Sequence, residues 1–153
     1  MLLDAIEVQE ILPHRPPFLF IDRVVSVEDD TIIAHKAVSS CEPVLQGHFP
    51  GNPILPGVVQ VEAMAQAAVL LVGKLGRFDS NLHNCLFIGI QEAKFRQPVR
   101  PGELLEIEVK AVRLGRIGRF EGVVRVGDTV KSQAKFTAII EPKAKPQAPE
   151  GSS

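Results

Sequence analysis

The sequence contains no tryptophan, no tyrosine and only two cysteines. Cys41 and Cys85 are far apart, and neither has a cysteine or histidine at the spacing of a zinc site. We therefore expect two free thiols in a reducing compartment and no metal centre. The formal net charge is −1, so the composition lacks the basic excess typical of nucleic-acid-binding proteins.

The sequence also lacks the pattern of a targeting or membrane segment. The first 15 residues mix acidic with apolar side chains, unlike the basic start and unbroken apolar run of a signal peptide. The apolar stretch 58–72 is expected to be too short and too polar to cross a bilayer. We predict a cytoplasmic protein with one domain over residues 1–141. Residues 142–153 contain no large apolar side chain and are predicted to form a disordered tail.

The most informative stretch is GHFPGNPILPGVVQVEAMAQAAVLLVGKL, residues 47–75. It begins as a loop rich in glycine and proline that contains His48, and Gly57 leads from this loop into a helix. The helix is apolar on nearly every side, which indicates a buried helix. Glu62 is the one carboxylate within it, and a buried carboxylate is costly unless it is paired or functional.

The remaining sequence predicts mostly strands. Alternating apolar residues and turn signals predict a short helix and six strands over residues 6–12, 18–27, 31–38, 86–97, 105–111, 119–126 and 130–140. The short connections at Asp29–Asp30 and Gly127–Asp128 indicate antiparallel hairpins. One helix would cover one face of this sheet. Because that helix is apolar all round, its outer surface needs another cover, so we expect at least a dimer.

His48 and Glu62 allow two interpretations at this point. The histidine could be a structural loop residue, and the glutamate could form an ion pair or reach the surface. If they converge, an imidazole, a carboxyl with a pKa raised by burial and the N–H of Gly57 at a helix N-terminus would share a pocket. A base, an acid and an oxyanion donor beside an apolar groove suit proton abstraction next to a carbonyl.

Three stretches carry a resemblance to a known family: LPHRPPFLFIDRV, GHFPGNPILPGVVQVEAMAQ and EAKFRQPVRPGELL. They resemble, in order and over about residues 5–141, the signatures of the β-hydroxyacyl-[acyl-carrier-protein] dehydratases of bacterial-type fatty acid synthesis. The resemblance implies an α+β hot-dog fold, in which a curved antiparallel sheet of about six strands wraps around one long helix. It also implies dehydration of (3R)-hydroxyacyl-[acyl-carrier-protein] to trans-2-enoyl-[acyl-carrier-protein] in the fatty acid elongation cycle. No metal or redox cofactor is implied, and the substrate is carried on the phosphopantetheine of acyl carrier protein.

The resemblance also implies residue roles. His48 would remove the C2 proton, Glu62 would protonate the departing hydroxyl, and the amide of Gly57 would polarise the thioester carbonyl. Val58 follows at the helix entry. In this family the site lies between two protomers, with the His of one facing the Glu of the other, and dimers commonly assemble as trimers of dimers. Glu62, where a related branch has Asp, and Val58, where that branch has Cys, favour a dehydratase without isomerase activity.

One departure from the family pattern concerns aromatic residues. Pro16 stands where the family usually has Tyr. Any aromatic gate at the substrate tunnel would therefore have to come from phenylalanines, and the candidates are Phe18, Phe49, Phe87 and Phe95.

Basic residues around the third stretch have two possible roles. Lys94, Arg96 and Arg100 could form a solvated sheet edge that discourages edge pairing. They could instead bind the acidic carrier protein and its phosphopantetheine phosphate. The isolated histidines are interpreted as non-catalytic, with a structural role for the first; they are His14, His35 and His83.

Two other functions remain possible on the same fold. A hot-dog acyl thioesterase would hydrolyse the thioester with a carboxylate and a water molecule, whereas elimination needs a separate base and acid, as His48 and Glu62 would provide. A non-catalytic acyl-binding module would not need either residue.

Overall fold

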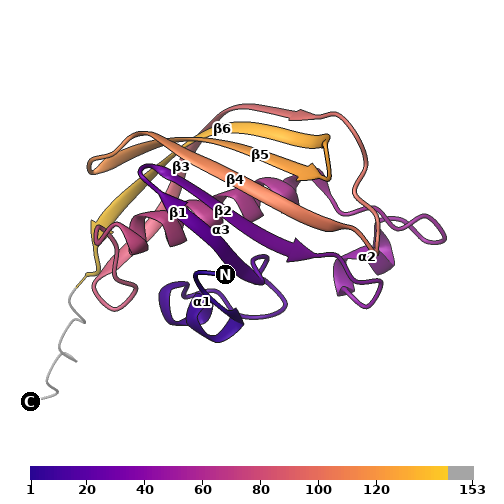
Figure 1. The fold of residues 1–153 in the computed structure, drawn as a ribbon, viewed down its shortest axis with the longest axis horizontal. Coiled ribbons are helices and arrows are strands. Elements are labelled where there is room, and N and C mark those ends of the chain that lie inside the picture. The colour runs from indigo at the N-terminus through magenta and orange to yellow at the C-terminus, as the bar shows by residue number, and fades with distance from the viewer. Residues whose placement is uncertain (145–153) are drawn as a thin grey trace, which may run out of the picture.

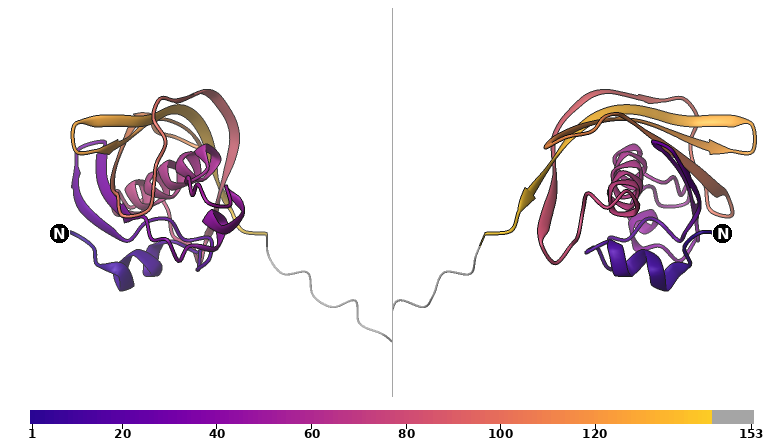
Figure 2. Two further views of the ribbon diagram at one scale, coloured as in Figure 1. Left: turned by 90° about the vertical axis from the view of Figure 1, so that its right-hand side faces the viewer. Right: turned by 60° about the vertical axis from the view of Figure 1, so that its left-hand side comes forward.

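The computed structural model describes residues 1–144, which form a curved sheet around a central helix (Figures 1 and 2). The elements in chain order are α1 (Ala5–Ile11), β1 (Arg23–Glu28), β2 (Thr31–Ala37), α2 (Pro43–Gly47), α3 (Gly57–Lys74), β3 (His83–Phe95), β4 (Leu104–Arg113), β5 (Ile117–Val126) and β6 (Thr129–Pro142). Figure 2 shows the sheet arching over α3, with α1 on the opposite side of that helix. This is the hot-dog architecture expected from the sequence.

The sheet has six strands in the order β1-β2-β4-β5-β6-β3, and every neighbouring pair is antiparallel. Two tight turns close the predicted hairpins. The β1–β2 turn contains Asp29 at φ 52°, and the β5–β6 turn contains Gly127 at φ 56°. Both are left-handed conformations that Asp and Gly tolerate better than most residues. In the part of the chain that the structure describes, this strand order leaves β1 and β3 at the two edges of the sheet.

Helix α3 fills the hollow of the sheet. Its buried side chains include Met64 and Leu70, which join Ile107 and Phe136 of the sheet in one core. At Gly122 the helix approaches so closely that a Cβ would lie 2.6 Å from the sulfur of Met64. By length and composition α3 could span a membrane, contrary to the expectation from the sequence. However, 61% of it is buried within the protein, which identifies it as the core helix of this domain.

The chain's own N-terminal segment covers part of the open side of α3. Val8, Leu12 and Ile21 are buried there. The expected need for a partner subunit is thus reduced but not removed, because Val58, at the start of α3, keeps 75% of its surface exposed.

Some predicted boundaries shift. The first strand begins at Arg23 rather than at residue 18, and α2 had no counterpart among the predicted elements. Strand β6 reaches Pro142, the first residue of the predicted tail, and Lys143 donates a backbone hydrogen bond to the carbonyl of Leu82. The rest of that tail, residues 145–153, lies outside the described residues.

Strand β3 is an edge strand with an unusual surface. Within residues 1–144, β6 is the one strand that pairs with it. No residue of β3 is buried, and four of its large apolar side chains keep between 50% and 54% of their surface exposed, namely Leu86, Ile88, Ile90 and Phe95. A long apolar edge of this kind can pair with another chain.

Candidate active site

His48 follows α2 directly and starts the loop that leads to α3. Its backbone carbonyl accepts a hydrogen bond from Ile54 N at 2.8 Å, and its ring Nδ1 lies 2.8 Å from the carbonyl oxygen of Ile54. Because a carbonyl oxygen can only accept, Nδ1 must carry the proton in this hydrogen bond. The loop therefore fixes the tautomer in which Nε2 is unprotonated and free to act as a base.

His48 lines a cavity of about 450 Å³ together with the first residues of α3. The other lining residues come from the loop before α3, from the first turn of α3, and from the end of β3 and the loop after it, namely Ile54, Leu55, Pro56, Gly57, Val58, Gln60, Phe95, Arg96, Gln97 and Pro98. The N-terminus of an 18-residue helix thus lies against this cavity, where its free N–H groups favour negative charge. No hydrogen bond of the Gly57 N–H occurs within residues 1–144.

Gly57 makes a close contact with the Phe95 ring. A Cβ at this position would lie 2.6 Å from Cε1 of Phe95, so a side chain here would force the Phe95 ring to shift. The absence of a side chain therefore lets the ring of Phe95 sit directly against the helix entry. Of the four phenylalanines considered for gating, Phe95 is the one that lines this cavity, while the Phe49 ring stacks on His48 at 4.1 Å between centroids.

Glu62 lies on α3, one turn after Val58, and its side chain is 19% exposed. Burial raises the pKa of its carboxyl, and a hydrogen bond from Gln66 partly opposes that shift. Gln66 Nε2 donates to Glu62 Oε1 at 3.1 Å. The Nε2 atom of His14 lies 3.6 Å from the same oxygen. A carboxyl with a raised pKa is suited to donating a proton near neutral pH.

Within the described chain the two key residues do not meet. No hydrogen bond or ion pair joins His48 to Glu62 in residues 1–144, and Glu62 is not among the residues lining the His48 cavity. A complete base–acid pair therefore cannot be assembled from the contacts of one chain alone.

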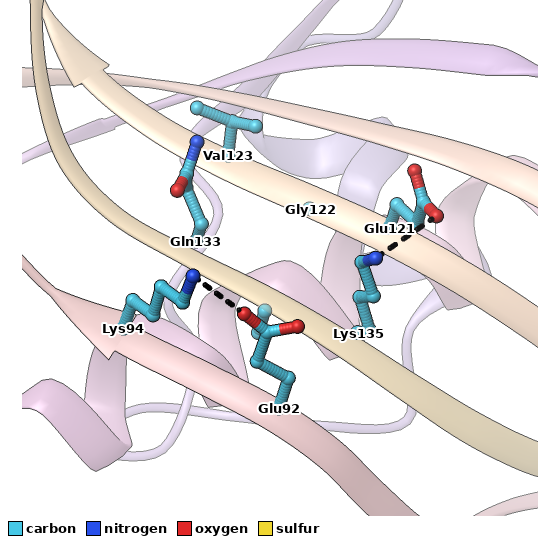
Figure 3. Close-up of a pocket in the computed structure, with 8 residues that line it drawn as sticks. Glu92, Lys94, Glu121, Gly122, Val123, Gln133 and Lys135 are labelled. Carbon is cyan, nitrogen blue, oxygen red and sulfur yellow. Dashed lines mark ion pairs between the residues drawn. The ribbon is translucent and has the colours of Figure 1, made fainter.

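The three basic candidates have separate surroundings. Arg100 donates to Asn52 Oδ1 at 2.8 Å, which connects it to the His48 loop. Arg96 lines the cavity, and its guanidinium donates two hydrogen bonds to Gln133. Lys94 is paired with Glu92 at 2.9 Å, and Figure 3 shows this pair beside a second ion pair of the sheet, between Lys135 and Glu121.

Sequence reasoning missed the neighbours of Glu62. It treated His14 as structural, and it did not consider Gln66, although Gln66 is four residues after Glu62 on the same helix and so faces it. The two cysteines are free, and burial raises the pKa of Cys85 to about 11. Residues 1–144 contain no cluster of three His, Cys, Asp or Glu side chains that could hold a metal ion.

Comparisons with known proteins agree with the motifs. A model of the FabA-like domain matches residues 12–135. A relative from Rhizorhabdus wittichii, 51% identical over 141 residues, covers 90% of this chain and 89% of its own length. Another from Symbiobacterium thermophilum is 46% identical, covering 90% and 97%. Both are named 3-hydroxyacyl-[acyl-carrier-protein] dehydratase FabZ.

Solved structures show the fold. The dehydratase heterocomplex ApeI:P of Xenorhabdus doucetiae has a TM-score of 0.73 at 23% identity and covers 88% of this chain and 90% of its own. A mutant of the thioesterase PA1618 of Pseudomonas aeruginosa has a TM-score of 0.61 at 18% identity, covering 79% and 81%. Dehydratases and thioesterases thus share this architecture, so the fold alone does not select the reaction.

Proposed function

This chain belongs to the FabA-like family, and we propose that it uses His48, Glu62 and the amide of Gly57 to dehydrate (3R)-hydroxyacyl-[acyl-carrier-protein]. It is a 3-hydroxyacyl-[acyl-carrier-protein] dehydratase, a hydro-lyase of fatty acid elongation, as are the curated relatives that match nearly its whole length. The product is the trans-2-enoyl thioester, and we propose that the enzyme does not isomerise its double bond.

The reaction needs one base and one acid. Nε2 of His48 takes the proton from C2, and the electron pair of that C–H bond forms the new double bond. Glu62 gives its proton to the hydroxyl at C3, and the C–O bond breaks to release water. The observation that carries this proposal is the hydrogen bond between His48 Nδ1 and the Ile54 carbonyl, because it leaves Nε2 as the basic nitrogen.

The thioester carbonyl gains negative charge as the C2 proton leaves. We propose that the N–H of Gly57, at the start of α3, donates a hydrogen bond to this negatively charged oxygen, assisted by the helix dipole. Since base, acid and oxyanion donor complete the elimination, we propose that no metal or redox cofactor takes part. The phosphopantetheine arm of the carrier protein brings the substrate.

We further propose that each active site is shared between two subunits. The separation of His48 from Glu62 within one chain supports this, because the missing partner of each would come from the second copy. The exposed apolar edge β3 and the exposed Val58 supply a surface for that copy. The homodimers are proposed to assemble further, as trimers of dimers, in the cytoplasm.

Subunit mixing tests the shared site. A His48→Ala chain keeps Glu62, and a Glu62→Gln chain keeps His48. After unfolding and refolding of an equal mixture, half the dimers are mixed and each contains one intact site, so about a quarter of wild-type activity is expected. Continued inactivity of the refolded mixture, with mixed dimers verified by two affinity tags, would contradict a shared site.

We propose that the carrier protein docks beside the mouth of the His48 cavity. Arg100, held at the loop by Asn52, and Arg96, which lines the cavity, can pair with the phosphate and with acidic side chains of the carrier. Lys94 contributes to this proposal only through long-range attraction, because its ammonium is already paired with Glu92.

The activity assay must separate dehydration from thioester hydrolysis. The purified chain is incubated with 3-hydroxybutyryl-carrier protein while enoyl thioester absorbance and free carrier thiol are followed together. We expect enoyl product without thiol release. Thiol release without enoyl product would overturn the dehydratase and favour the thioesterase that the shared architecture allows.

A further inference from the structure

Gln66 is a polar side chain in the middle of the core, with 0% of its surface exposed. Its Oε1 accepts from Phe20 N at 2.8 Å, and its Nε2 donates to the carbonyl of Phe18 at 3.0 Å. The second N–H of the same amide donates to Glu62 Oε1 at 3.1 Å. A buried amide is tolerated only when its groups are paired, and here both donors and the oxygen are used.

The orientation of this amide is fixed by the backbone. A backbone N–H can only donate and a backbone carbonyl can only accept, so exchanging the oxygen and nitrogen of Gln66 would break both contacts to Phe18 and Phe20. An N–H therefore always faces Glu62. The helix side chain, rather than a neighbouring strand, thus satisfies backbone groups of Phe18 and Phe20, and backbone bonding to β2 begins only at Asp22, whose N–H donates to the carbonyl of His35.

The two contacts of the Glu62 carboxyl converge on one oxygen. Gln66 donates to Oε1, and the His14 Nε2 lies 3.6 Å from it, with the imidazole stacked on the ring of Phe18. The other oxygen, Oε2, has no hydrogen bond from any residue between 1 and 144. An oxygen held by a donor cannot present its own proton in the same direction, so the proton of the neutral carboxyl belongs on Oε2.

We infer that Gln66 is a positioning residue for Glu62, which fixes Oε1 as an acceptor and presents Oε2 as the oxygen that delivers the proton to the leaving hydroxyl. His14 assists from the N-terminal segment. This inference rests on the proposed role of Glu62 as the acid. It gives the stretch LPHRPPFLFIDRV a function, because the backbone of Phe18 and Phe20 holds the Gln66 amide, and this amide in turn holds the carboxyl of Glu62.

Few ionisable groups face Glu62. His14 is neutral near pH 7, because burial and the neighbouring Arg15 lower its pKa, and its Nε2 lies 3.6 Å from Glu62 Oε1, which is beyond hydrogen-bond distance. The guanidinium of Arg15 is bonded to the backbone carbonyls of Leu12, His14 and Gln9. In the proposed dimer the remaining group is His48 of the partner subunit. The N–H of Gln66 favours the ionised carboxyl and so lowers the Glu62 pKa against burial.

The test compares kcat and KM over a pH series for the full-length wild type and Gln66→Met, which is similar in length but makes no such hydrogen bonds. We expect kcat to fall by about 10- to 100-fold while KM changes less than about 3-fold. In a plot of kcat against pH, the loss of activity on the alkaline side (the alkaline limb) should move to higher pH. Without the N–H of Gln66 the Glu62 carboxylate is less stabilised, so its pKa rises. The matched control is Leu70→Ala, which removes a buried side chain from the same helix without touching the carboxyl. It should leave kcat and the limb unchanged.

A second pair of variants decides the question if Gln66→Met does not fold. His14→Phe keeps the ring on Phe18 but removes the nitrogen that faces Glu62 Oε1, and it should lower kcat and shift the limb in the same direction. His14→Gln can place an amide N–H near the position of Nε2 and should restore most of kcat.

The outcomes are distinguishable. If Glu62→Gln is inactive while Gln66→Met and His14→Phe both keep wild-type kcat and limb, the positioning role is wrong and the proposed function stands. If Glu62→Gln keeps wild-type turnover, the acid itself has been misassigned and both proposals fall.

Discussion

Glu62→Gln should make the protein more stable at neutral pH and at the same time nearly inactive. The side chain is 19% exposed, and burial raises the pKa of its carboxyl. A raised pKa in the folded state means that the folded chain holds a proton the unfolded chain has already lost. Between the two pKa values the unfolded state binds fewer protons, so stability falls as pH rises.

The magnitude follows from this linkage. Each unit by which folding raises the pKa lowers the stability of the wild type by about 1.4 kcal/mol, once the pH exceeds the folded value. Glutamine has nearly the same shape, and its oxygen can still accept from Gln66, so the variant avoids this loss. Because the amide cannot donate an acidic proton, kcat should fall by about 100- to 10,000-fold.

Urea unfolding at equal protomer concentration, in steps from pH 4 to pH 8, measures the effect, since an oligomer's stability depends on concentration. We expect the two curves to lie close at acidic pH and to separate as pH rises through the Glu62 pKa, with the variant more stable. Parallel curves for wild type and Glu62→Gln, or a variant that is less stable at pH 8, would refute the raised pKa.

Three further predictions concern His48, Gly57 and Arg100. His48→Ala should lower kcat by more than about 1,000-fold with an unchanged circular dichroism spectrum, since the ring is only half-buried; substantial turnover would contradict the base assignment. Gly57→Ala should lower kcat because the new methyl displaces the Phe95 ring, and Phe95→Ala in the same chain should restore part of it; equal losses in the single and double variants would exclude this steric cause. Arg100→Glu should raise KM for the carrier-bound substrate more than KM for the same acyl group on a short pantetheine thioester, and loss of the Asn52 contact alone, tested as Asn52→Ala, should not do so.

Local patterns predicted most of the fold because they report burial directly. The alternation in strands β4, β5 and β6 appears in the sequence with a period of two, since each has one face on the core and one toward solvent. The mostly apolar sequence of α3 likewise indicated a helix enclosed by the sheet. Residues 18–22 were assigned wrongly to a strand, because their apolar composition resembles one, while the distant Gln66 side chain satisfies backbone groups of Phe18 and Phe20.

The sequence by itself determined the central helix, the antiparallel sheet around it, and the His48, Gly57 and Glu62 motif that identifies the family. These depend on residue type and spacing along the chain. Only the tertiary structure decided the tautomer of His48, the environment of Glu62 and the separation of these two residues within one chain. Those properties depend on which backbone groups lie within about 3 Å of a side chain, and contacts between distant segments form only when the chain folds.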